Sequence, residues 1–241
     1  SFIPEHRETL FFNPRRNMTD LILALDQGTT SSRSILFTEK AEIRAVASEP
    51  LECRYPDSGW VEQDAEAIWE TQRSTIVKVL DQAGIGLSEV SAIGITNQRE
   101  STIAWNRETG EALCPAINWQ CRRTAGFCDE LKEEGFDELI RNRTGLVTDP
   151  YFSGTKMHWI LQNVPEAANL ARQGKLCFGT VDSWLIWKLS GGTTHAIEIS
   201  NASRTLVFDI QKCEWDSEIL SRFGIPCLLY TSDAADDVIS V

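Results

Sequence analysis

The stretch of sequence that decides the fold reads Leu21-Ile22-Leu23-Ala24-Leu25-Asp26-Gln27-Gly28-Thr29-Thr30-Ser31-Ser32-Arg33-Ser34-Ile35-Leu36-Phe37. Five apolar residues end at Asp26, a turn rich in hydroxyl residues follows, and a second apolar run begins at Ile35. Short apolar runs that are bounded by turn residues are typical of buried strands. The stretch therefore predicts two strands joined by a tight turn.

The turn between these strands carries the donors that a phosphate group requires. Gly28 allows a backbone conformation closed to other residues and a close approach of its N–H to a ligand. Thr29, Thr30 and Ser31 add amide and hydroxyl donors in series. Asp26 is a carboxylate that needs a partner, and Mg²⁺ on a nucleotide phosphate would supply one. An ordinary polar hairpin explains the same residues, and the Gly-Lys-Ser/Thr of a Walker A loop is absent.

A longer match surrounds the turn. The segment A-L-D-Q-G-T-T-S-S-R at residues 24–33 resembles the first phosphate loop of the FGGY family of carbohydrate kinases. The same family is indicated by G-I-T-N-Q-R-E at 94–100, N-W-Q-C-R-R-T at 118–124, P-Y-F-S-G-T-K-M-H-W-I-L-Q-N at 150–163, G-T-V-D-S-W-L-I-W-K-L at 179–189 and S-N-A-S-R-T at 200–205. The resemblance implies an α/β fold of the ribonuclease-H-like kind that actin, Hsp70 and hexokinase share, with a mixed sheet flanked by helices.

The resemblance also implies a nucleotide site. By carry-over, the phosphates of ATP are held by Gly28, Thr29, Thr30, Ser31 and Arg33. Asp26 helps to place the Mg²⁺ ion and is the implied metal residue. Phosphoryl transfer depends mainly on alignment and charge neutralisation, which suits this set of donors and one carboxylate.

A polyol site is implied in the same way. By carry-over, Arg99, Glu100 and Tyr151 hydrogen-bond the hydroxyls of glycerol, and Trp119 packs against its carbons. An arginine offers a rigid fork of donors and a glutamate offers acceptors, as a small polyol requires. Two simpler interpretations remain. Arg99 and Glu100 could neutralise each other in a surface salt bridge, and Trp119 and Tyr151 could be core aromatics.

The implied activity is the ATP-dependent phosphorylation of glycerol to glycerol 3-phosphate, by a phosphotransferase with an alcohol acceptor and a homo-oligomeric parent enzyme. The alternatives are another FGGY sugar or polyol kinase, a non-catalytic fragment that binds polyol or phosphate, and an ATPase of the actin or Hsp70 type. The resemblance places the general-base aspartate and the adenine-binding residues in a second, carboxy-terminal domain. We therefore assign no catalytic residue to this chain, and we expect the chain alone to be inactive.

The ends of the chain differ from the rest. The resemblance runs from Met18 to Pro226, and we predict one domain over residues 18–226. Residues 1–17 lack apolar periodicity and are expected to be upstream or tag sequence. Residues 227–241 resemble a translated sequencing adaptor, so we expect a foreign tail there.

Composition limits the partners and the location. The chain has 241 residues, and its net charge of −12 argues against nucleic acid and anionic membranes as partners. No apolar stretch has the length of a membrane span, so we expect a cytoplasmic protein. Seven cysteines without a C-x-x-C pair argue against a zinc site. Cys114, Cys121 and Cys128 recur every seven residues, and we interpret them as reduced, buried residues rather than as a redox site.

Three further residues raise alternatives. Lys156 is either a phosphate ligand or a helix lysine that extends its amine to solvent. His158 and His195 are expected to be structural or solvated, and we assign them no role.

Several other elements are predicted from pattern. Apolar residues at spacings of three and four predict a helix that begins after Asp64 and ends before Gly84. Strands are expected at 43–49, 90–95, 176–179 and 205–210, and a hairpin at 101–113. Further helices are expected at 124–134, 153–162, 165–173 and 182–189, with a last one that begins after Asp216 and ends at Gly224.

Overall fold

The computed structural model describes residues 21–226. The predictions for residues 1–17 and 227–241 lie outside the described residues. The strands are β1 (Leu21–Gln27), β2 (Ser31–Phe37), β3 (Ile43–Pro50), β4 (Glu62–Gln63), β5 (Val90–Asn97), β6 (Ile103–Asn106), β7 (Ala116–Ile117), β8 (Leu176–Gly179), β9 (Phe208–Asp209) and β10 (Glu214–Trp215). The helices are α1 (Ala65–Ala83), α2 (Ala125–Glu133), α3 (Asp137–Thr144), α4 (Ser153–Asn163), α5 (Pro165–Arg172), α6 (Val181–Leu189), α7 (Ile199–Ala202) and α8 (Ser217–Phe223), with a 3₁₀ turn η1 at Leu87–Glu89.

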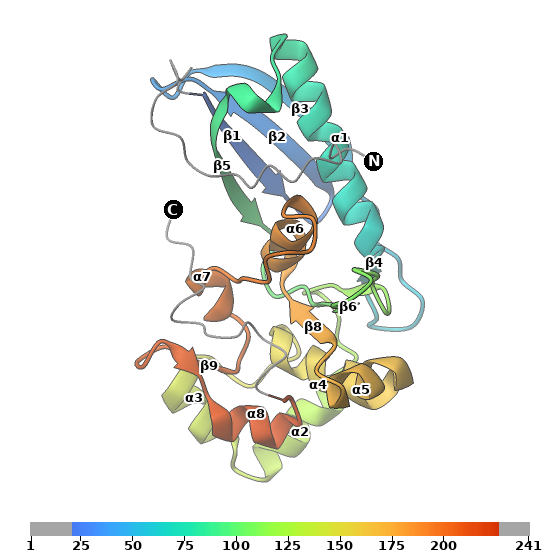
Figure 1. The fold of residues 1–241 in the computed structure, drawn as a ribbon. Coiled ribbons are helices and arrows are strands. Elements are labelled where there is room, and N and C mark those ends of the chain that lie inside the picture. The colour runs from blue at the N-terminus through green and yellow to red at the C-terminus, as the bar shows by residue number, and fades with distance from the viewer. Residues whose placement is uncertain (1–20, 227–241) are drawn as a thin grey trace.

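A four-stranded sheet forms one end of the molecule (Figure 1). Its strand order is β3-β2-β1-β5, and β1 pairs antiparallel with β2 but parallel with β5. The predicted strand, turn and strand are confirmed, and so is the mixed sheet. The carboxyl ends of the parallel strands β1 and β5 therefore lie side by side, which is where α/β sheets place their ligands.

Helix α1 covers one face of this sheet (Figure 1). Asp64 caps it by accepting hydrogen bonds from the backbone N–H of Glu66 at 3.0 Å and of Ala67 at 3.2 Å. Gly84 ends it in the left-handed conformation, with φ of +65°. Both predicted caps are confirmed, because a helix end needs partners for its free N–H and C=O groups wherever the helix lies.

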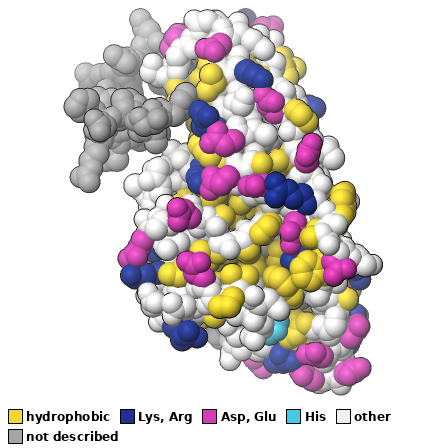
Figure 2. Space-filling view, turned by 90° about the vertical axis from the view of Figure 1, so that its right-hand side faces the viewer, with side chains coloured by type: hydrophobic (Ala, Val, Ile, Leu, Met, Phe, Trp, Pro, Cys, Tyr) yellow, Lys and Arg dark blue, Asp and Glu magenta, His cyan; other side chains and the backbone are white. Residues whose placement is uncertain are grey.

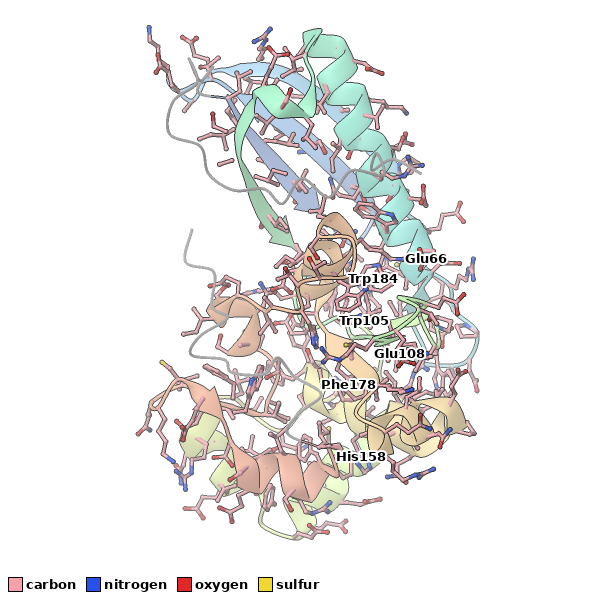
Figure 3. The ribbon with its side chains drawn as sticks, viewed as in Figure 1. Glu66, Trp105, Glu108, His158, Phe178 and Trp184 are labelled. Atoms are coloured by element: carbon pink, nitrogen blue, oxygen red, sulfur yellow. The ribbon has the colours of Figure 1, made fainter. Side chains whose placement is uncertain are left out.

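The middle of the molecule is an aromatic core around the pair β6 and β8. Trp105 of β6 is fully buried against Trp184 of α6, with ring centroids 5.4 Å apart. Figure 3 shows both indoles, with Phe178 of β8 below them. Below this layer, a separate apolar core is surrounded by α2, α3, α4, α5 and α8 (Figure 1). Both strands of this pair were predicted, although their pairing with each other was not.

One predicted strand is wrong in extent. The apolar run at 205–210 predicts a strand, but only Phe208–Asp209 is one. Leu206 has a φ of +72°, which breaks the extended backbone. The carbonyl of Thr205 accepts a hydrogen bond from Gly154 N at 2.6 Å. The run is apolar because it is buried beside the start of α4, and burial alone gives the same composition as a strand.

Two helices, α3 and α7, were not predicted. Helix α3 buries only Ile140 and Thr144, and α7 has four residues, so neither shows a clear apolar face in the sequence. No helix within residues 21–226 is long and apolar enough to cross a membrane. Figure 2 shows acidic and basic side chains mixed over one face, with hydrophobic side chains gathered in its lower half. The net negative charge is therefore not one continuous acidic surface on this face.

Candidate active site

The predicted phosphate loop is a tight turn between β1 and β2. Gly28 N donates to Ser31 O at 2.9 Å. The expected reason for the glycine is wrong, because Gly28 is not among the residues with positive φ. Instead, a Cβ at this position would lie 3.1 Å from Ser31 O. Glycine is needed here because the turn leaves little room for a side chain.

The backbone of the loop has two N–H groups that are available to a ligand. The N–H groups of Thr29 and Thr30 have no hydrogen-bond partner within residues 21–226, and Thr30 is exposed. The carbonyls face the other way: Thr29 O accepts from Gln63 Nε2 at 2.8 Å, and Thr30 O accepts from Leu51 N at 2.9 Å. With their carbonyls held, the two residues present free N–H groups, which is the arrangement that binds a phosphate oxygen.

Asp26 and Arg33 lie opposite each other in the register of β1 and β2, on the face of the sheet away from α1. Asp26 is half-buried and Arg33 is exposed. In the part of the chain that the structure describes, the Asp26 carboxylate has neither a hydrogen bond nor an ion pair. A Mg²⁺ ion that is carried by nucleotide phosphates uses one or two protein carboxylates. A single unengaged carboxylate beside the phosphate loop fits such an ion.

Trp119 links the phosphate loop to the predicted polyol residues. Its indole Nε1 donates to the hydroxyl Oγ1 of Thr29 at 2.9 Å. Its ring packs edge-on against Tyr151, with centroids 5.4 Å apart. Both aromatics are half-buried, and Tyr151 packs against the edge of the lower apolar core. Three residues that are far apart in the sequence are thereby brought together, and the aromatic faces remain partly open.

Glu100 is the buried member of the predicted polyol pair. It is 2% exposed, and its carboxylate Oε1 accepts from Arg204 Nε at 2.7 Å. The Arg204 guanidinium also lies 4.9 Å above the Phe152 ring. Arg99 is exposed and forms no ion pair within residues 21–226. The predicted mutual neutralisation of Arg99 and Glu100 is wrong, because Glu100 turns inward to Arg204 and leaves Arg99 facing solvent.

A cluster of buried amide side chains lies behind both loops. It consists of Gln27, Gln63, Gln98 and Asn118, all of which are at most 8% exposed. Gln98 Nε2 donates to Gln63 Oε1 at 2.9 Å and to Gln27 Oε1 at 3.1 Å. Asn118 Nδ2 donates to Gln63 Oε1 at 3.0 Å and to Gln98 Oε1 at 3.1 Å. Through Gln63 the cluster holds the carbonyl of Thr29, so one network fixes the backbone of both loops.

None of these amides was predicted as a site residue. The sequence did carry one signal for them, because Gln27, Gln98 and Asn118 lie inside the quoted motifs. Amide side chains are mostly exposed in proteins, so the residue type alone does not predict a buried cluster. Arg204 and Asn201, in S-N-A-S-R-T, were missed as well. Asn201 accepts from Asn97 at 3.0 Å and Arg204 donates to Glu100, so this segment holds both the last residue of β5 and the loop after it.

Lys156 matches neither of its predicted roles. It is fully buried, so it neither reaches solvent nor faces a phosphate. Its Nζ donates to the backbone carbonyl of Glu100 at 3.1 Å and to that of Tyr151. Burial lowers the pKa of its ammonium group to about 7, although the Glu100 charge acts in the opposite direction. The lysine therefore serves the backbone of two predicted polyol residues.

His158 and His195 are structural, which is one of the two roles predicted for them. His158 stacks on Phe127 at 3.8 Å, and its Nδ1 pairs with Phe223 O at 2.8 Å. Figure 3 shows His158 among the helices far from the phosphate loop. His195 Nε2 pairs with Phe178 O at 2.7 Å. A carbonyl only accepts, so each of these ring nitrogens carries a proton.

The cysteine prediction holds for two residues of the heptad set. The six cysteines within residues 21–226 are all free. Cys121 and Cys128 are buried, and Cys114 is half-buried. Burial raises the pKa of the Cys128 thiol to about 12, so this thiol stays protonated and unreactive.

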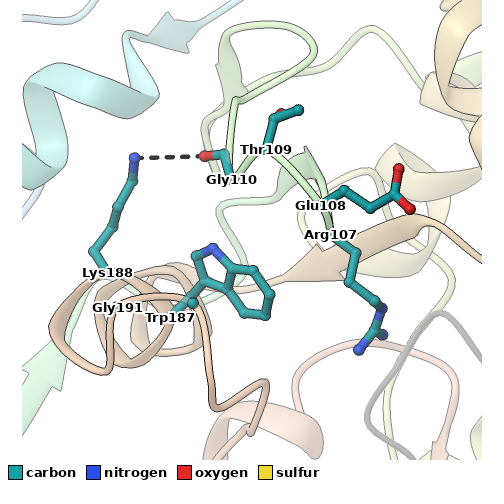
Figure 4. A pocket seen from close by; sticks show the side chains of 8 residues that line it. Arg107, Glu108, Thr109, Gly110, Trp187, Lys188 and Gly191 are labelled. Carbon is teal, nitrogen blue, oxygen red and sulfur yellow. Dashed lines mark hydrogen bonds between the residues drawn. The ribbon is translucent and has the colours of Figure 1, made fainter. Parts of the chain in front are cut away.

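A pocket of about 250 Å³ lies away from these residues, between the hairpin after β6 and the end of α6 (Figure 4). Its cations are already engaged. Lys188 Nζ donates to Glu66 at 2.9 Å and to Gly110 O at 3.5 Å, and Arg107 lies 3.4 Å from His195 Nδ1. The pocket contains none of the predicted site residues, and its paired charges give no reason to assign it chemistry.

The sequence and the fold match those of known proteins. A family model described as the N-terminal domain of the FGGY family of carbohydrate kinases matches residues 21–230. The glycerol kinase of Carboxydothermus hydrogenoformans is 53% identical over 205 residues, which are 85% of this chain and 41% of that protein. The glycerol kinase of Shewanella frigidimarina is 55% identical over the same length and with the same coverage. The chain thus spans about two fifths of the length of the curated relatives that it matches.

Solved structures give the same result. A crystal structure of Plasmodium falciparum glycerol kinase with ADP superposes with a TM-score of 0.78 at 30% identity, covering 88% of this chain and 42% of that one. A gluconate kinase from Lactobacillus acidophilus has a TM-score of 0.77 at 21% identity, covering 88% and 41%. The latter likeness concerns the fold alone.

Proposed function

Since the chain belongs to the FGGY family of carbohydrate kinases, we propose that it forms one wall of a site that phosphorylates glycerol with ATP. One observation carries the proposal: Trp119 contacts Tyr151 and donates to Thr29, so the polyol residues and the phosphate loop lie against each other. A hydroxyl and a γ-phosphoryl group must lie next to each other for transfer, and this contact puts their binding residues side by side.

The chemistry follows from the donors. The free N–H groups of Thr29 and Thr30, with Ser31 and Arg33, would hold the nucleotide phosphates. Asp26 would bind a Mg²⁺ ion, and when bound the ion neutralises charge on the transferred group. Glycerol would lie with its carbons on Trp119, and the hydroxyl of the adjacent Tyr151 would hydrogen-bond one of its hydroxyls. Glu100 would accept a hydrogen bond from one of its hydroxyls, and the exposed Arg99 would donate to another.

The proposed transfer forms one bond, breaks one bond and releases one proton. A hydroxyl oxygen of glycerol forms a bond to the γ-phosphorus, the bond from that phosphorus to the β–γ bridging oxygen breaks, and the hydroxyl loses its proton. The donors named above align the two oxygens and neutralise charge. We assign the proton acceptor to no residue within residues 21–226.

Glycerol is favoured over a sugar because the relatives that are more than half identical to this chain carry the name glycerol kinase. The polyol residues are also compact: two aromatic rings and one paired carboxylate suit a molecule of three carbons. The free state of the described cysteines is typical of a reducing compartment and supports a cytoplasmic location.

A chimera tests the proposal. The matched 205 residues of the Carboxydothermus hydrogenoformans relative are replaced by the corresponding residues of this chain. We expect ATP-dependent phosphorylation of glycerol, with kcat/KM for glycerol at least about tenfold above that for D-xylulose or gluconate. Asp26→Ala should abolish turnover. A preference for either sugar substrate would favour another kinase of the family, and binding without turnover would favour a non-catalytic module.

The 241-residue chain alone is the matched comparison. It should form no glycerol 3-phosphate above a protein-free blank, because within residues 21–226 the phosphate loop has donors on one side only. Turnover by this chain that disappears on Asp26→Ala would show that one wall is sufficient.

A further inference from the structure

Lys156 is an unusual lysine because all of it is buried and its amine meets backbone rather than a carboxylate. It lies in the first turns of α4 and is 0% exposed. Its Nζ donates to Glu100 O at 3.1 Å and to Tyr151 O. A methionine would fill the same space without the cost of desolvating an amine. What the amine adds is therefore these two donated bonds.

The first of these bonds holds a strained residue. Glu100 has a φ of +63°, in the left-handed region that non-glycine residues seldom adopt. Such a residue persists only where its surroundings hold it, and such residues gather at functional sites. The carbonyl of Glu100 is held by Lys156 Nζ and also by the Ser153 hydroxyl at 3.2 Å. These two donors come from the beginning of α4, and the Thr102 hydroxyl adds a longer bond at 3.4 Å.

The conformation of Glu100 decides where its side chain lies. In this conformation the carboxylate reaches Arg204 at 2.7 Å, whereas its neighbour Arg99 faces solvent. An extended residue at position 100 would send its side chain in another direction, since the backbone angles set the direction of Cβ. The hydrogen bonds that the Glu100 carbonyl accepts thus fix the position of the carboxylate.

The second bond reaches the other side of the polyol site. Tyr151 belongs to the turn before α4, and its ring packs on Trp119 at 5.4 Å. The backbone N–H of Tyr151 is held by Asp149 Oδ1 at 2.9 Å, and its carbonyl is held by Lys156. One amine therefore connects the strained residue at 100 to the aromatic residue at 151.

We propose that Lys156 is a positioning residue for the polyol site: by donating to the carbonyls of Glu100 and Tyr151, it sets the distance and direction between the acceptor carboxylate and the aromatic wall. The inference rests on the proposed function for the identity of the ligand. Its geometric part, the local ordering of residues 99–101 and 151–153, stands without it.

The test uses the 241-residue chain and two readouts. Lys156→Met keeps the length and volume of the side chain but removes both donated bonds. Amide hydrogen exchange should become at least about tenfold faster at residues 99–101 and 151–153, and stay unchanged within β1. Lys188→Met is the matched control, because it removes another lysine that donates to a carbonyl and leaves both segments untouched. Glycerol binding by calorimetry should weaken at least about tenfold in Lys156→Met only.

Ser153→Ala serves if Lys156→Met does not fold. It removes the second donor that α4 gives to the Glu100 carbonyl, so exchange should rise at 99–101 and remain unchanged at Tyr151. Uniform acceleration over the whole chain, or no acceleration at 99–101, would overturn the inference. If the exchange pattern is as expected but glycerol binds neither the wild-type chain nor the chimera, the proposed ligand is wrong and the positioning role stands.

Discussion

The indole nitrogen of Trp119 donates a hydrogen bond to the hydroxyl of Thr29 at 2.9 Å, across 90 residues of sequence. The donated bond uses one lone pair of the hydroxyl and leaves its own proton free. Thr29 can therefore still donate to a phosphate oxygen while Trp119 holds it in place. This relationship suggests that the polyol wall and the phosphate loop act as one unit, which mutants can examine.

A double-mutant cycle on Trp119→Phe and Thr29→Val, made in the chimera, measures the coupling free energy between these two residues. Phenylalanine keeps the aromatic face but loses the donor. We expect a coupling free energy of about 0.5–1.5 kcal/mol in kcat/KM for glycerol, the usual net value of one hydrogen bond. Trp159→Phe paired with Thr29→Val is the control, since Trp159 packs on Trp60 instead. Additive effects in the first cycle would contradict the link.

Arg99→Ala should weaken the use of glycerol without weakening the fold. Arg99 is exposed and forms no ion pair within residues 21–226, so its loss should change the free energy of unfolding by less than about 0.5 kcal/mol. Loss of a charged hydrogen bond to the substrate should raise the KM for glycerol by roughly ten- to a hundredfold, with the KM for ATP nearly unchanged. Arg44→Ala, an exposed arginine on β3, is the control. An unchanged KM for glycerol would remove Arg99 from the site.

Gln98→Leu should destabilise the 241-residue chain more than a surface change does. The substitution leaves the amides of Gln27, Gln63 and Asn118 short of partners in a buried place. We expect a loss of about 3 kcal/mol or more, since each unsatisfied buried group costs about 1–3 kcal/mol. Gln162→Leu on the exposed side of α4 should change stability by less than about 0.5 kcal/mol. Urea denaturation measures both, and equal effects would argue against the buried network.

The buried lysine should make stability depend on pH. Burial lowers the pKa of Lys156 to about 7, whereas an unfolded lysine titrates near 10.4. Between these values the unfolded chain binds a proton that the folded chain has released, so stability rises with pH. Below pH 7 both states are protonated and the full cost of burial remains.

Lys156→Met isolates this dependence. From pH 7 to pH 9 the stability of the wild type relative to the variant should rise, with a slope that approaches about 1.4 kcal/mol per pH unit. Urea denaturation at pH 7, 8 and 9 gives both curves. A constant difference between the two proteins would show that the amine keeps its ordinary titration.

The sequence by itself determined the elements whose causes are local. The short apolar runs at 21–25 and 35–37 and the caps at Asp64 and Gly84 predicted the first strands and α1, because turn residues and free helix ends act over a few residues. The motifs indicated the family, and through that resemblance they implied that Trp119, Tyr151 and Glu100 bind the polyol. The motifs could not indicate which hydrogen-bond and ion-pair partners these residues have.

Only the tertiary structure decided those partners. Glu100 pairs with Arg204 rather than with the adjacent Arg99, Lys156 turns inward to two carbonyls, and Gln98 joins amides from three other segments. Apart from the bond from Lys156 to Tyr151, which spans five positions, these contacts join residues that are 20 to 104 positions apart. A buried polar group must find its partner wherever packing places one, and that place depends on the whole core rather than on the residues beside it in sequence.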